Sequence, residues 1–325
     1  MESEYSIQPL TFERVSTYSI AERKSKVHAD MFAKAMDGSE NVLAFISKLP
    51  HILAADSLRT LIRSILYARA SGKPIIWGLG GHVVKVGLGP VINDLLSSGF
   101  VTGIAMNGSG AIHDFEVALC GSTSEEVEEQ IGSGKFGMAR ETGEYMNAAI
   151  ESAAKNRIGM GEALGRFITA NQASDVSFRY RSSSILAEAH SRKVPVTIHV
   201  AIGTDIIHTH PHASGSSLGE ATYHDFRLFC SMIRELDGGG VYLNIGSAVV
   251  LPEVFLKALS VVRNLGNQLE EFTGANLDFI QHYRPTQNVL KRPTQNSGQS
   301  IALTGHHEIM IPLIAAALKG SLNNK

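Results

Sequence analysis

Hydrophobic and polar residues follow two alternating patterns along this chain. Short apolar runs that enter glycines, such as KPIIWGLGG at 73–81, are typical of a buried strand and the turn after it. Longer segments carry apolar residues at helical spacing, as in DSLRTLIRSILYARASG at 56–72, which begins with an Asp cap and closes with a glycine. The patterns therefore predict a chain that alternates between strands and helices.

The alternation continues to the C-terminal end and indicates the fold class. Strands are predicted over 73–81, 100–110, 194–203, 238–246 and 276–283. Helices are predicted over 17–36, 56–72, 89–99, 182–193, 222–236, 252–266 and 308–320. Strands that alternate with helices favour an α/β fold with a doubly wound, mostly parallel sheet covered on both faces, here preceded by N-terminal helices.

No shift in composition divides the chain, so a single α/β domain is predicted over 1–325. Within it, 1–70 is interpreted as an N-terminal helical segment and 71–325 as the core. The glycine-punctuated segment 121–172 is interpreted as a helical insertion of that core. RPTQN occurs at 284–288 and again at 292–296, and this short echo predicts an exposed loop.

Composition and charge exclude several classes of protein. With 44% hydrophobic and 18% charged residues the chain is globular, and its net charge of −2 without a Lys/Arg stripe argues against nucleic-acid binding. No apolar run approaches the ~18 residues of a membrane span, and the acidic start is unlike a signal peptide. Two cysteines, Cys120 and Cys230, are interpreted as buried thiols of a reducing compartment, so a cytoplasmic location is expected.

Glycine-rich turns follow several predicted strands, at 78–81, at 107–110 and around Gly203 and Gly246. In a doubly wound sheet, ligands gather outside the carboxyl ends of the strands, where glycine lets backbone N–H groups approach a phosphate. Plain turns need glycine as well, and the dinucleotide fingerprint is incomplete because Val83 stands where its third glycine is expected. A nucleotide site and a purely structural turn therefore both remain open.

Five segments taken together suggest a family. They are IIWGLGGHVVKVGLGPVINDLL, SSGFVTGIAMNGSGAIHDFE, VPVTIHVAIGTDII, DGGGVYLNIGSAVVL and GHHEIMIPLIAAAL. In order and spacing, over roughly 70–320, the chain resembles the deoxyhypusine synthase and homospermidine synthase family. The resemblance implies a Rossmann-like sheet, bound NAD, a small-molecule substrate and a homo-oligomer, either a dimer or a tetramer.

The departures from the family pattern bear on the chemistry. The family's T-S-N becomes Gly80-Gly81-His82, and its paired glutamates become Ile112 and His113, followed by a retained Asp114. The W-G-K motif with the imine-forming lysine is absent, and Lys291 is the nearest lysine to that position. The chain is therefore interpreted as a deoxyhypusine-synthase-like protein that is not a genuine deoxyhypusine synthase.

These comparisons define a candidate site. A carboxylate replaced by an imidazole indicates a ligand that is not a polycation, and histidine can relay the proton that accompanies a hydride transfer. The residues predicted to be catalytic are His113, Asp114, Glu308 and Lys291. Those predicted to bind the cofactor are Gly78, Gly80, Gly81, His82, Gly108, Ser109, Gly110, Asp205 and His306.

The loop TDIIHTHPHASG contains His208, His210 and His212 and leaves an alternative open. A His-x-His pair on a strand can bind zinc, but Pro211 interrupts the strand, and no HExxH motif or cysteine pair supports a metal. The favoured function is NAD-dependent dehydrogenation or group transfer on a small substrate. The alternatives are a non-catalytic nucleotide-binding protein and a metal-dependent hydrolase that uses these histidines.

Overall fold

The computed structural model describes residues 4–171, 173 and 177–323, and it is built around one parallel sheet. The strand order is β3-β2-β1-β4-β5-β6, and every neighbouring pair is parallel. This order is that of the doubly wound Rossmann sheet, and it confirms the predicted fold class. The strands are β1 (Ile75–Leu79), β2 (Gly103–Asn107), β3 (Val196–His199), β4 (Gly240–Ile245), β5 (Phe272–Asp278) and β6 (Gln299–Thr304).

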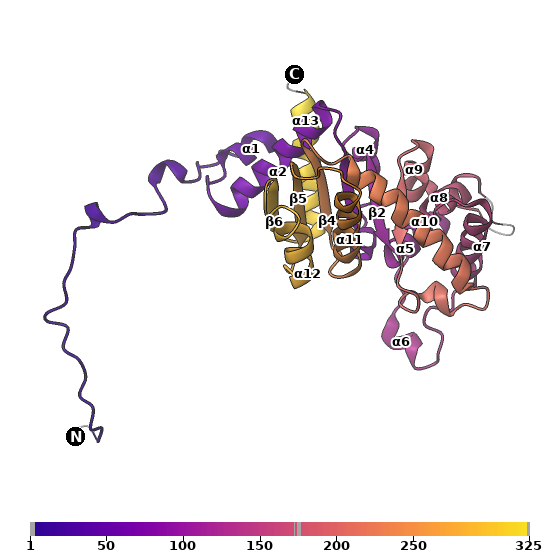
Figure 1. The fold of residues 1–325 in the computed structure, drawn as a ribbon, viewed down its shortest axis with the longest axis horizontal. Coiled ribbons are helices and arrows are strands. Elements are labelled where there is room, and N and C mark those ends of the chain that lie inside the picture. The colour runs from indigo at the N-terminus through magenta and orange to yellow at the C-terminus, as the bar shows by residue number, and fades with distance from the viewer. Residues whose placement is uncertain (1–3, 172, 174–176, 324–325) are drawn as a thin grey trace.

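Helices cover both faces of the sheet, as the apolar strand sequences require (Figure 1). On one face, Trp77 packs into a large apolar core with α2, α4 and α13; on the other, Tyr242 packs with α10 and α11. The helices are α1 (Val42–Lys48), α2 (Leu53–Ala70), α3 (Gly81–Lys85), α4 (Gly89–Ser97), α5 (Gly108–Cys120), α6 (Val127–Ile131), α7 (Arg140–Asn156), α8 (Met160–Thr169), α9 (Ile185–Ser191), α10 (Gly215–Arg234), α11 (Val250–Asn264), α12 (Tyr283–Pro285) and α13 (His307–Asn323).

Two buried aspartates join helices to their neighbours. The Asp114 carboxylate on α5 accepts hydrogen bonds from Ser184 Oγ and from the backbone N–H groups of Ile185 and Leu186, at the start of α9. Asp225 on α10 accepts from the backbone N–H of Ile198 in β3, at 2.9 Å. Burial raises the pKa of Asp114 to about 6 and that of Asp225 to about 7.

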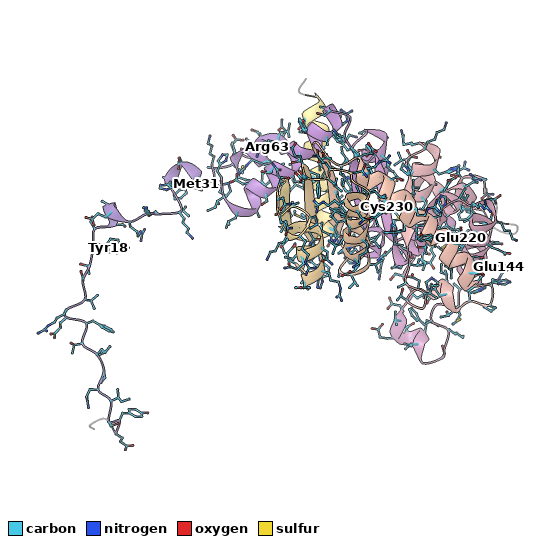
Figure 2. The ribbon with its side chains drawn as sticks, in the orientation of Figure 1. Tyr18, Met31, Arg63, Glu144, Glu220 and Cys230 are labelled. Carbon is cyan, nitrogen blue, oxygen red and sulfur yellow. The ribbon has the colours of Figure 1, made fainter. Side chains whose placement is uncertain are left out.

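The predicted helix over 17–36 is wrong. This segment is extended, with two short 3-10 turns at Ile20–Glu22 and Ala29–Met31. It leaves the body of the molecule, and Tyr18 and Met31 mark its course (Figures 1 and 2). Apolar spacing alone does not make a helix, because an amphipathic helix in water depends on a surface against which its apolar face can pack. The side chain of Ile20, for example, is 76% exposed.

The C-terminal third also differs from the prediction. The strand expected over 276–283 is β5, which lies four residues earlier, and β6 was not predicted. The first RPTQN, expected in an exposed loop, is helical: α12 leads into a π-helix over Thr286–Lys291, in which Val289 is buried. The polar sequence of this segment gives no helical pattern. The π-helix depends on its packing against β5 and β6, and local sequence does not reveal that contact.

Helices α6, α7 and α8 lie in the segment interpreted as an insertion. Residue 172 of that segment, and residues 1–3 and 324–325 at the chain ends, lie outside the described residues. Among the helices that the structure describes, none is both long enough and apolar enough to cross a membrane.

Candidate functional site

The strand order reverses between β1 and β4, and the backbones that leave these two strands cross closely. Gly80 N donates a hydrogen bond to Ile245 O at 2.8 Å. A Cβ at Gly80 would lie 2.0 Å from Gly246 O, and Gly246 itself has a φ of 66°. Both positions therefore require glycine, one for close approach and the other for its left-handed conformation.

Two helix N-termini flank this crossing. Helix α3 starts at Gly81, directly after β1, and α11 starts at Val250, shortly after β4. At α11, Ser247 Oγ accepts a hydrogen bond from Leu251 N at 3.2 Å. Helix α3 has no capping side chain, because its N-cap residue is Gly80. N–H groups at the start of a helix that follows a parallel strand are the usual donors to a bound phosphate. The start of α3 lies at the carboxyl end of β1, the edge at which doubly wound sheets hold dinucleotides.

Imidazole and aromatic rings surround the crossing. The ring of the exposed His82 lies 5.5 Å from that of His307 and 6.0 Å from that of Phe279, and the Phe279 ring stacks on His306 at 6.3 Å. His307 is buried, and its Nδ1 has no hydrogen-bond partner. Its Nε2 lies 3.2 Å from Leu277 O, and burial lowers the pKa of this imidazole. The rings give the crossing an apolar wall with a few polar atoms, which suits a planar ligand.

The start of α5 is built differently, although its sequence is just as glycine-rich. Asn107 Oδ1 accepts a hydrogen bond from Gly110 N at 2.9 Å and so caps the helix. A Cβ at Gly108 would lie 2.1 Å from Asp205 Oδ2, so the Asp205 carboxylate already occupies the space beside this glycine. The protein's own side chains thus fill the place where a phosphate was expected at 107–110.

Three further predicted residues serve the fold or lie elsewhere. Gly78 lies inside β1, where the Tyr242 hydroxyl covers it. The carboxylate of Asp114 is buried and already accepts hydrogen bonds from the start of α9. Lys291 is exposed at the end of the π-helix. The structure therefore offers these residues no contact with a ligand at the strand ends.

A cavity of about 220 Å³ lies beside α5 and brings several predicted residues together. Ser109, His113 and Asp205 line it with Lys85 from α3. His113 Nδ1 lies 2.7 Å from Thr123 Oγ1, which donates a hydrogen bond to Glu116 Oε2 at 2.5 Å. Burial, with a smaller contribution from the Lys85 charge, lowers the pKa of His113 to about 4, so its imidazole is neutral at pH 7.

Glu116, Thr123 and Lys85 were not among the predicted site residues. Glu116 follows His113 by three residues on the same helix, so helical spacing already places them on one face. Thr123 lies beyond the helix end, and only the folded chain brings it to the imidazole. Glu308 and His306 are exposed at the start of α13, with Glu308 Oε1 at 3.8 Å from His306 Nδ1.

The histidine loop is a local turn. His208 Nδ1 accepts hydrogen bonds from the backbone N–H groups of Gly203 and Asp205, and the rings of His210 and His212 stack at 5.1 Å. Over residues 4–171, 173 and 177–323, no group of three or more His, Cys, Asp or Glu side chains could hold a metal ion. The three histidines thus form no metal-binding group.

Solved structures share this fold. A LOR/SDH-type protein of Methanococcus maripaludis S2 superposes with a TM-score of 0.51 at 13% identity, over 83% of this chain and 71% of that one. The ternary complex of AgrE with ornithine and NAD+ superposes with a TM-score of 0.50 at 10% identity, over 86% of this chain and 35% of AgrE. This chain thus spans about a third of AgrE. At these identities the likeness shows the fold alone.

A protein of Entamoeba histolytica assigned as a deoxyhypusine synthase is also similar, with a TM-score of 0.49 at 11% identity, over 88% of this chain and 95% of that one. Neither a protein-family model nor a curated protein sequence matches this chain.

Proposed function

We propose that this protein binds NAD at the crossing of β1 and β4 and uses it in dehydrogenation or group transfer on a small substrate. The observation that carries the proposal is the close approach of Gly80 and Gly246 where the strand order reverses, with the uncapped start of α3 beside it. The backbone N–H groups of Gly81 and His82 are suited to hold the pyrophosphate, and the rings of His82 and Phe279 to hold a planar group. A solved structure of the same fold, AgrE, contains NAD+.

The chemistry proceeds without a lysine imine. Lys291 is exposed, whereas a Schiff-base lysine needs desolvation or a neighbouring charge that lowers its pKa. Bound NAD would accept a hydride from the substrate. The His113 imidazole, which lines the neighbouring cavity with Lys85 and Asp205, would accept the proton.

The test is calorimetric titration of the purified protein with NAD+. We expect saturable binding, and we expect the substitution His82→Glu to weaken it about fivefold, because a carboxylate at the start of α3 repels the pyrophosphate. His28→Glu, an identical change on the exposed N-terminal segment, is the control and should leave the affinity unchanged. Wild-type protein that shows no heat of binding at millimolar NAD+ contradicts the proposal.

A non-catalytic nucleotide-binding protein is the second candidate. The absence of the family's imine-forming lysine motif favours it. NAD+ binding that depends on His82, together with no reduction of NAD+ over a broad panel of small alcohols and amines, would favour this candidate over the enzyme.

A further inference from the structure

The contacts of His113 determine which of its ring nitrogens carries the proton. Glu116 receives two hydroxyl donors, Thr123 Oγ1 on Oε2 and Thr142 Oγ1 on Oε1, the latter at 3.0 Å. An ionised carboxylate only accepts hydrogen bonds, so the single proton of the Thr123 hydroxyl points to Glu116. Thr123 Oγ1 can then meet His113 Nδ1 at 2.7 Å only as an acceptor, which places the imidazole proton on Nδ1.

The other nitrogen is left free. Among the described residues no hydrogen bond to Nε2 of His113 is found, and this side chain lines the 220 Å³ cavity beside Ser109. With the proton on Nδ1, the lone pair of Nε2 is available to accept a proton from a molecule in that cavity.

We propose that Thr123 and Glu116 are positioning residues that hold His113 in the Nδ1–H tautomer, so that Nε2 accepts a hydrogen bond from a ligand that carries an O–H or N–H group. The inference rests on the proposed function only for the nature of this ligand. The tautomer itself is a property of the protein alone, because every contact that sets it lies within the chain.

The neighbouring charges are consistent with a neutral base. Lys85 from α3 faces the imidazole and disfavours its protonation. Three carboxylates line the same cavity, but Glu116 is occupied by two hydroxyls and Glu125 by the backbone N–H of Gly137, at 2.7 Å. Asp205, from the segment after β3, is the third, and burial raises its pKa.

The tautomer can be read directly by NMR of protein labelled with 15N-histidine, without NAD or substrate. Protonated and unprotonated ring nitrogens differ widely in 15N shift, and the His113→Gln variant assigns the signals of this residue. We expect wild-type His113 at pH 7 to carry its proton on Nδ1, the tautomer that free imidazole side chains populate less.

Three substitutions test the positioning role. Thr123→Val removes the acceptor, so His113 should change to the Nε2–H tautomer, whereas Thr123→Ser should retain the Nδ1–H form. Glu116→Gln should also produce the Nε2–H form, because a Gln amide that donates to Thr123 leaves the hydroxyl proton free to point at Nδ1. Thr142→Val, which removes the other donor to the same carboxylate, is the matched control and should leave the tautomer unchanged.

An Nε2–H tautomer in the wild-type protein would overturn the inference, as would an Nδ1–H tautomer that survives in Thr123→Val. Circular dichroism of each variant verifies that it is folded. Because the spectra need no cofactor, they stand even if the NAD+ titration fails, and the two proposals can therefore fail separately.

Discussion

The helices that follow β1 and β2 start with similar glycine-rich sequences, GLGG and NGSG, yet their N-termini differ. At α5, Asn107 caps the helix and Asp205 packs against Gly108. At α3, no side chain caps the helix, and Gly80 instead allows the backbone of β4 to approach. Glycine at a strand end thus has two uses: Gly80 lets a backbone approach closely, and Gly108 lets a side chain approach closely.

The largest expected effect is the difference in stability between alanine substitutions at Gly80 and at Gly108. Gly80→Ala places a methyl group 2.0 Å from a backbone oxygen that cannot move alone, so we expect a loss of about 3 kcal/mol or more in unfolding free energy. Gly108→Ala meets the Asp205 side chain, which can rotate, so the loss should be about 1 kcal/mol. Urea unfolding of both variants measures the difference, and equal losses would refute the distinction.

A second effect concerns Asp114, which joins α5 to the start of α9, and its contribution to stability depends on pH. The pKa of Asp114 is raised from 3.8 to about 6, so between these pH values the folded protein binds more protons at this carboxyl than the unfolded chain does. Stability from this group is therefore complete below pH 4 and is lost as the pH rises to 6, by up to about 3 kcal/mol.

The Asp114→Asn variant isolates this effect because Asn does not titrate. The unfolding free energy of the wild type minus that of the variant should fall between pH 4 and 6 and stay constant above pH 7. Taking the difference cancels the histidines with lowered pKa, such as His199, whose pH dependence has the opposite sign. A difference that rises with pH would show that the folded-state pKa of Asp114 is lowered.

The smallest effect tests the cap itself. Asn107→Ala should reduce the unfolding free energy by about 1 kcal/mol, because Gly110 N–H loses its acceptor, and Asn107→Asp should retain most of the stability. Thermal unfolding of the three proteins gives the comparison. A stability of Asn107→Ala equal to wild type would mean that the α5 N-terminus does not depend on this cap.

Much of the sheet could be predicted from local sequence. Strands β1 to β4 are continuous apolar runs because parallel strands are buried on both faces, and each run is bounded by glycine or by a helical pattern. Strand β6 lies at the edge of the sheet and alternates between exposed and buried residues, so its short sequence QSIALT gave no such signal. The N-terminal segment shows the opposite error: a helix was predicted and none forms. Its apolar residues have helical spacing, but no other element packs against them.

The candidate site was predictable in part. His113 and Ser109 follow from their place after β2, and Gly80 and Gly81 from theirs after β1. Asp205 fills the space beside Gly108, although the two residues are 97 positions apart in the sequence. Glycine spacing does not reveal a contact of this kind. The role of Thr123 likewise exists only once the segment after α5 folds back onto the imidazole.

Helix α10 protects β3, the strand at one edge of the sheet. Asp225 and Thr222 bond to main-chain groups of β3 that face away from β2: Asp225 accepts from Ile198 N, and Thr222 donates to Ile198 O at 2.8 Å. Helices α10 and α8 both pack against β3, and the outward N–H and C=O of Ile198 are already bonded, so this edge offers a poor template to a passing chain. Growth of the sheet by strand addition, the route by which exposed edges lead to aggregation, is therefore disfavoured on this side.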